Sequence, residues 1–122
     1  MGQSTEVRRA LVVEDEIMVA MYVEDLLTEL GFEVAGIATN LDQALPLARD
    51  GDFDFAVLDI NLAGQLSFPA ADVLRDRGIP FLFASGYASK GVNEDYRSAV
   101  RIQKPFLGRD LAQAIGKLEV TR

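Results

Sequence analysis

Acidic side chains, a hydroxyl group and a lysine follow four short apolar runs of this chain. Two carboxylates about 4 Å apart repel each other by roughly 4 kcal/mol at an effective dielectric constant near 20, so acids that meet need a cation or a proton between them. Mg²⁺ suits such a cluster because it prefers a few oxygen ligands and several retained waters. With a serine hydroxyl and a lysine ammonium added, the set could receive a phosphoryl group attached to a carboxylate. The residues are Glu14, Asp15 and Glu16, then Asp59 and Asn61, then Ser85 and Gly86, and finally Lys104 and Pro105.

The apolar runs that precede these residues have the length and composition of β-strands. The chain has five such runs, and the first, third and fourth of them lack polar alternation, which is typical of strands buried on both faces of a sheet. The last run alternates, so we expect it at an edge. The predicted strands are Arg9–Val13, Phe32–Ala38, Phe53–Asp59, Ile79–Ser85 and Ala99–Lys104.

Amphipathic segments separate the strands and predict helices. Asn40 is a predicted N-cap, Gly31 and Gly78 are predicted helix ends, and Pro46 predicts a kink. The segment from Tyr87 to Ser98 has few apolar anchors and predicts a short, mobile helix. The apolar stripes are Val19, Val23, Leu26, Leu27 and Leu30; Leu41, Ala44, Leu45 and Ala48; Val73 and Leu74, in a helix that begins near residues 67–69; and Leu107, Leu111, Ala114, Ile115 and Leu118.

Five strands alternating with five helices predict an α/β fold with a doubly wound parallel sheet and helices on both faces. Ligands of such sheets bind beyond the carboxyl ends of the strands, at the topological switch point. The acids, the hydroxyl and the lysine all lie at these ends, so we expect them to converge. Phe81 and Phe83 are predicted core residues without a function.

Composition limits what else the chain can do. Its 122 residues, 49% hydrophobic and 25% charged, predict one domain over residues 1–122, with a core at about 8–118 and no output domain. The absence of cysteine and histidine excludes disulfides and the commonest zinc ligands. A net charge of −7 disfavours nucleic acid and anionic membrane as partners. Without a long apolar segment, we expect a cytoplasmic protein. We also expect no organic cofactor.

The motifs "LVVEDE", "VLDINL", "FASG" and "QKPF" follow one another along the chain. Together they resemble the receiver domain of two-component response regulators, from about Arg8 to about Leu118. The resemblance implies a flavodoxin-like sheet of order 2-1-3-4-5. The stretch "PFLFASGYA" is similar to the FAT GUY subgroup, typically small stand-alone receivers served by kinases of the HWE or a related class.

The resemblance assigns a role to each of the converging residues. Asp59 becomes the phosphoacceptor, which attacks the phosphohistidine of a partner sensor histidine kinase. The protein itself is a signalling domain and not an enzyme, and its output passes to a downstream protein target or a phosphotransfer protein. The implied Mg²⁺ ligands are Asp15, Asp59 and the Asn61 backbone carbonyl, with Glu14 acting through water; Ser85, Gly86 and Lys104 bind the phosphoryl group; the Lys104–Pro105 bond is cis; and Tyr87, Asn61 and Pro105 tune conformation or phosphate lifetime.

The sequence also departs from the family pattern. Arg101 stands where many receivers carry an aromatic residue, and the loop "LAGQLSFPAA" lacks the proline usual soon after the acceptor. Rotation of an aromatic side chain at position 101 therefore cannot report phosphorylation. Our hypothesis is that Tyr87 and the segment up to Ser98 replace that switch.

Other interpretations remain open at this point. Asp59 and Asn61 could be turn formers, the acids near residue 15 could serve a helix N-terminus, and Tyr87 could be a packed aromatic. A degenerate receiver would bind partners without phosphorylation. An aspartyl phosphohydrolase would need an acid at position 61, where the chain has asparagine, and a flavin phosphate would be repelled by "EDE".

Overall fold

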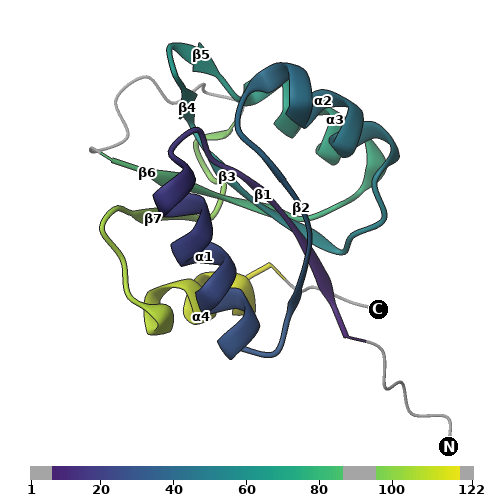
Figure 1. Ribbon diagram of the computed structural model, residues 1–122. Helices are drawn as coiled ribbons and strands as arrows, with labels where there is room; N and C mark the ends of the chain where they lie inside the picture. The colour runs from purple at the N-terminus through teal and green to yellow at the C-terminus, as the bar shows by residue number, and fades with distance from the viewer. Residues whose placement is uncertain (1–6, 87–95, 119–122) are drawn as a thin grey trace, which may run out of the picture.

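A computed structural model describes residues 7–86 and 96–118, which form a five-stranded parallel sheet with helices on both faces (Figure 1). The strand order is β2-β1-β3-β6-β7, the order predicted. A separate two-stranded hairpin, β4-β5, follows β3. The elements are β1 (Arg9–Val13), α1 (Ile17–Glu29), β2 (Glu33–Ala38), α2 (Leu41–Asp50), β3 (Phe55–Asp59), β4 (Asn61–Leu62), β5 (Gln65–Leu66), α3 (Phe68–Arg77), β6 (Phe81–Ser85), β7 (Arg101–Gln103) and α4 (Gly108–Gly116).

The central strands bury both faces, as their continuous apolar sequence predicts. Alternate residues of β1 enter different clusters: Leu11 and Val13 pack with α2 and α3, whereas Ala10 and Val12 pack with α1 and α4. Figure 1 shows the same division, with α1 and α4 on one side of the sheet and α2 and α3 on the other. β7 lies at an edge, as its alternating sequence indicated.

Local signals at the helix ends are confirmed. The side chain of Asn40 accepts a hydrogen bond from the Gln43 backbone N–H at 2.8 Å, which satisfies one free donor of α2. Gly31 and Gly78 follow α1 and α3 with φ of 94° and 72°, a backbone conformation that only glycine adopts without strain. Pro46 lies inside α2.

Several predicted boundaries were wrong by a few residues. β6 begins at Phe81 because Pro80 has no N–H for the strand ladder. β7 is shorter than predicted because the Ala99 N–H still donates to Tyr96 in a turn. Leu30 and Leu107 are exposed because they cap α1 and α4 instead of lying on their buried faces.

The β4-β5 hairpin was not predicted. Its turn is formed by Ala63 and Gly64, both with positive φ (53° and 94°), and sequence signals for such turns favour asparagine or aspartate where Ala63 stands. The predicted short helix after Tyr87 falls mostly on residues 87–95, which lie outside the described residues. No helix among the described residues is long and apolar enough to cross a membrane.

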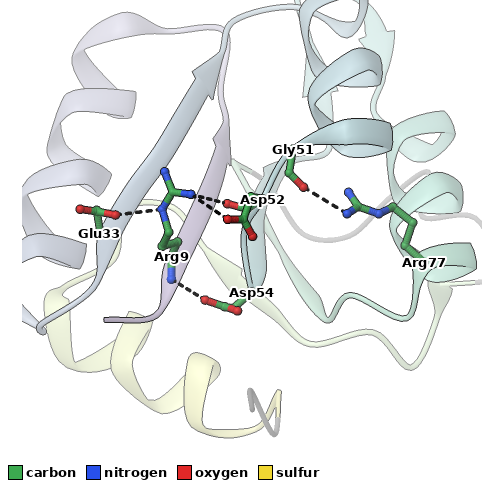
Figure 2. A network of polar contacts seen from close by, with 6 residues as sticks. All are labelled: Arg9, Glu33, Gly51, Asp52, Asp54 and Arg77. Atoms are coloured by element: carbon green, nitrogen blue, oxygen red, sulfur yellow. Dashed lines mark hydrogen bonds and ion pairs between the residues drawn. The ribbon is translucent and has the colours of Figure 1, made fainter. Parts of the chain in front are cut away.

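An arginine network joins the amino ends of three strands (Figure 2). Arg9 donates to Glu33 at 2.8 Å and to the Asp52 carbonyl at 2.7 Å, and its backbone N–H donates to the Asp54 carboxylate at 2.7 Å. Arg77, at the end of α3, donates to the Gly51 carbonyl at 3.1 Å. These contacts lie at the edge of the sheet opposite to the predicted site.

Ser67 provides a test of the packing at the start of α3. Its side chain is fully buried, and its hydroxyl has no hydrogen-bond partner in the described part of the chain. We predict that Ser67→Ala raises the free energy of unfolding by about 1 kcal/mol, since it removes an unpaired buried polar group. Urea denaturation measures the change.

A helix-cap substitution is the matched control. Asn40→Ala removes a side-chain oxygen that has a defined partner, so it should lower the free energy of unfolding by about 1 kcal/mol. Destabilisation by Ser67→Ala as well would contradict the assignment of an unpaired hydroxyl.

Candidate functional site

Three carboxylates meet where β1 and β3 end. Val13 of β1 pairs with Leu58 of β3, so the residues that follow, Glu14 and Asp59, leave the sheet side by side. Oxygen atoms of Glu14, Asp15 and Asp59 lie within 4.8 Å of one another. Glu14 and Asp59 are only 3% and 8% exposed. The structure thus brings together the acids that the sequence predicted to converge.

Lys104 reaches into this acidic cluster from the end of β7. Its Nζ atom donates to Glu14 Oε1 at 2.5 Å and to Asp59 Oδ2 at 3.2 Å, and its side chain is 17% exposed. The Lys104 backbone N–H donates to the Ser85 carbonyl at 2.7 Å, which fixes the start of the loop after β7. The Lys104–Pro105 peptide bond is cis, as the resemblance implied.

Burial dominates the electrostatics of the two acids. It raises the pKa of Glu14 to about 7, although the hydrogen bond from Lys104 acts to lower it. Burial likewise raises the pKa of Asp59 against the positive charge of Lys104. For Lys104, burial acts to lower the pKa, but the hydrogen bond to Glu14 and the charge of Asp59 outweigh it, so the pKa is raised. The single positive charge of Lys104 therefore does not neutralise the negative charge of both buried carboxylates.

The donor set fits a hard divalent cation. Glu14, Asp15 and Asp59 supply oxygen atoms only, which are the ligands that Mg²⁺ prefers. The charge of such an ion would also offset the excess of carboxylates over the single ammonium. Glu16, the fourth acid of this region, is exposed, and its backbone N–H donates to Glu14 Oε2 at 3.1 Å, so its contribution is to orient Glu14.

The remaining predicted residues take different positions. Ser85 ends β6, directly after Ala84, which pairs with Asp59, and Gly86 follows it at the surface. Asn61 is exposed, and its side-chain oxygen accepts the Gly64 N–H at 2.7 Å, so the amide oxygen is engaged in the hairpin turn. Pro105 is exposed, and Tyr87 lies outside the described residues.

Arg101, the departure from the family pattern, binds backbone carbonyls. Its guanidinium donates to the carbonyl oxygens of Tyr96 at 3.3 Å and Arg97 at 3.0 Å. The Tyr96 ring is buried, stacks on Phe68 at 5.5 Å, and donates its hydroxyl to Asp72 of α3. The side chain of Tyr96 thus contacts α3. Arg101 holds the backbone carbonyls of Tyr96 and Arg97.

Sequence reasoning missed one contact close to the site. The Tyr22 hydroxyl on α1 donates to the Phe106 carbonyl at 2.7 Å, two residues after Lys104. Tyr22 lies outside the apolar stripe of α1 and is 84 residues from its partner, so no local pattern could reveal the contact.

The chain is similar to known proteins along most of its length. The protein family described as the response regulator receiver domain matches residues 10–116. The chemotaxis protein CheY of Thermotoga maritima is 34% identical over 116 residues, covering 91% of this chain and 97% of CheY. The transcriptional regulatory protein PdtaR of Mycobacterium tuberculosis is 29% identical over 119 residues; the match covers 94% of this chain but only 58% of PdtaR.

Solved structures support the same grouping. The solution structure of SdrG from Sphingomonas melonis Fr1 is 38% identical, with a TM-score of 0.84, and the match covers 93% of this chain and 98% of SdrG. The BeF3-activated conformation of SdrG from Pseudomonas melonis Fr1 is 36% identical, with a TM-score of 0.80, over 96% of this chain and 100% of SdrG.

The raised pKa of Glu14 predicts a pH dependence of stability. Between the ordinary pKa of 4.5 and the folded value of about 7, the folded protein keeps a proton that the unfolded chain has lost. In metal-free buffer, the free energy of unfolding should therefore fall as pH rises through this window, by ~3 kcal/mol at most. Urea denaturation at several pH values with a chelator present measures this slope.

Substitutions test whether Glu14 causes this pH dependence of stability. Glu14→Gln should reduce the slope between pH 4.5 and 7 to the part that Asp59 causes, whereas Glu29→Gln, at an exposed position of α1, should leave the slope unchanged. An unaltered slope in Glu14→Gln would contradict the assignment.

Proposed function

The chain belongs to the response regulator receiver family, and from this membership we propose that it is a phosphoacceptor in two-component signalling. In this proposal, Asp59 receives a phosphoryl group from a partner histidine kinase in the presence of Mg²⁺. The observation that carries the proposal is the position of Lys104, whose ammonium contacts both Glu14 and Asp59 at the carboxyl ends of the strands.

The proposed chemistry is transfer of a phosphoryl group to a carboxylate. An oxygen of Asp59 attacks the phosphorus of a phosphohistidine, the N–P bond breaks, and the imidazole that leaves takes up a proton. Lys104 then pairs with one oxygen of the bound phosphoryl group, and the hydroxyl of Ser85 donates to another. Gly86 adds no side chain beside this group, and a Cβ placed there would meet no atom of the described residues within 4 Å.

Mg²⁺ is the proposed cofactor. Asp15, Asp59 and the Asn61 backbone carbonyl would hold it, and Glu14 would contact it through water. When bound, the ion neutralises negative charge as the phosphoryl group approaches Asp59. The support for this assignment is the oxygen-only donor set and its excess of negative charge over Lys104.

The exposed face of α1 supports a protein partner. Ile17, Met18, Met21 and Tyr22 are all exposed, with Met18 at 76%, and they begin directly beyond the acidic cluster. Contiguous apolar side chains of this kind mark interaction surfaces. We propose this α1 face as the contact for the histidine kinase, of the HWE or a related class.

The wider role of the chain follows from the same proposal. In this proposal it is a cytoplasmic signalling domain and not an enzyme. Its downstream partner is a protein target or a phosphotransfer protein, bound at the face formed by β7 and α4. Nucleic acid, membrane and organic cofactors have no part in this mechanism.

Beryllofluoride provides the direct test because it mimics an acyl phosphate without being hydrolysed. With Mg²⁺ present, we predict NMR amide shifts centred on Asp15, Asp59, Ser85 and Lys104 upon addition of beryllofluoride. Asp59→Asn should abolish these shifts because the amide cannot bind the beryllium as the carboxylate does. The similarity to SdrG, which has a BeF3-activated conformation, supports this expectation.

A matched substitution controls for the loss of a negative charge. Asp50→Asn changes an exposed aspartate at the end of α2 and should leave the beryllofluoride response intact. If the native chain binds Mg²⁺ but shows no response to beryllofluoride, the phosphoacceptor proposal is wrong and the chain acts as a phosphorylation-independent binding module.

A further inference from the structure

Tyr22 joins the two segments that carry the opposite charges of the site. It lies on α1, which begins at Ile17, directly after the acids at positions 14–16. Its hydroxyl donates to the Phe106 carbonyl at 2.7 Å, and the two rings contact each other with centroids 6.0 Å apart. Tyr22 is 42% exposed, whereas Phe106 is buried. The side chain therefore covers the loop after β7 from the outside.

The loop that orients Lys104 is short. It runs from Lys104 to Leu107, between the end of β7 and the start of α4. At one end the Lys104 N–H donates to the Ser85 carbonyl at 2.7 Å, and at the other the Leu107 N–H donates to the Asp110 carboxylate at 2.8 Å. The bond from Tyr22 to Phe106 holds the middle.

The contact becomes more important when a phosphoryl group is present. In the described structure, Lys104 is also held by the 2.5 Å bond between its Nζ atom and Glu14. An ammonium that turns toward a phosphoryl oxygen must weaken that bond, so the loop loses an anchor. The hydroxyl of Tyr22 donates to a backbone carbonyl and not to a charged group of the site, so a rotation of the ammonium leaves its acceptor in place.

We propose that Tyr22 is a positioning residue, whose hydroxyl holds the Phe106 carbonyl and so keeps Lys104 aimed at a phosphoryl group on Asp59. This inference rests on the proposed function. It also connects that function to the α1 face, because Tyr22 belongs to both. A partner that covers this face would exclude water from the Tyr22–Phe106 bond and strengthen it.

Tyr22→Phe is the test, because it removes the hydroxyl and keeps the ring. The affinity for beryllofluoride at saturating Mg²⁺ should fall roughly 3- to 10-fold, the effect of losing one neutral hydrogen bond. The affinity for Mg²⁺ alone should stay within about twofold, since none of the proposed ligands of the ion lies in the loop from Lys104 to Leu107 that the hydroxyl holds. NMR titration of the native chain and of Tyr22→Phe measures the affinities for beryllofluoride and for Mg²⁺.

Two further variants show whether the hydroxyl acts through Lys104. Thr28→Ala changes another exposed position of α1, which has no role in the proposed site, and should alter neither affinity. In a Lys104→Gln background, Tyr22→Phe should have no additional effect on the remaining beryllofluoride affinity, because the group that it positions is absent.

The outcomes separate this inference from the proposed function. If the native chain does not bind beryllofluoride, the proposed function fails. If native and Tyr22→Phe bind beryllofluoride equally, the positioning role is wrong while the function stands. Equal losses of Mg²⁺ and beryllofluoride affinity would also overturn the positioning role, since they would show a general disturbance of the acids.

Discussion

A single ammonium group placed between two buried carboxylates is the constraint on which the rest of this structure depends. Lys104 contacts Glu14 and Asp59, and these three residues come from the ends of three different strands. Isolated charges of this kind are costly to bury unless they are paired. The parallel sheet meets this requirement because its strands end at one edge, and the arginine network at the opposite edge, around Arg9, ties the strand starts together.

Lys104 neutralises only part of the negative charge of Glu14 and Asp59, and the charge that is left can attract a cation. Burial raises the pKa of both acids even with Lys104 in place, so the site favours a proton or an added cation. A fully neutralised site would gain little from a metal ion. Here the excess negative charge favours binding of a divalent cation, and in the proposed function that cation would let an anionic phosphoryl group approach Asp59.

The route from the site to a partner differs from the family pattern at position 101. Arg101 binds the carbonyl oxygens of Tyr96 and Arg97, so it fixes backbone and has no ring to rotate. Tyr96 packs its ring against Phe68 and reaches α3 with its hydroxyl. The assignment of the switch to Tyr87 and the residues up to Ser98 remains a hypothesis. Tyr96, near the end of this segment, is a packed aromatic residue.

The sequence by itself determined the fold class, the strand order through its family resemblance, and the identity of the charged residues. These follow from local signals: apolar runs, a cap such as Asn40, and polar residues that end each strand. Only the tertiary structure decided which atoms meet. The Tyr22–Phe106 bond joins residues 84 positions apart, and the engagement of Asn61 in a hairpin turn depends on backbone angles at Ala63 that its residue type does not favour. Contacts of this kind are set by how elements pack, because burial and distance between remote segments have no local signature.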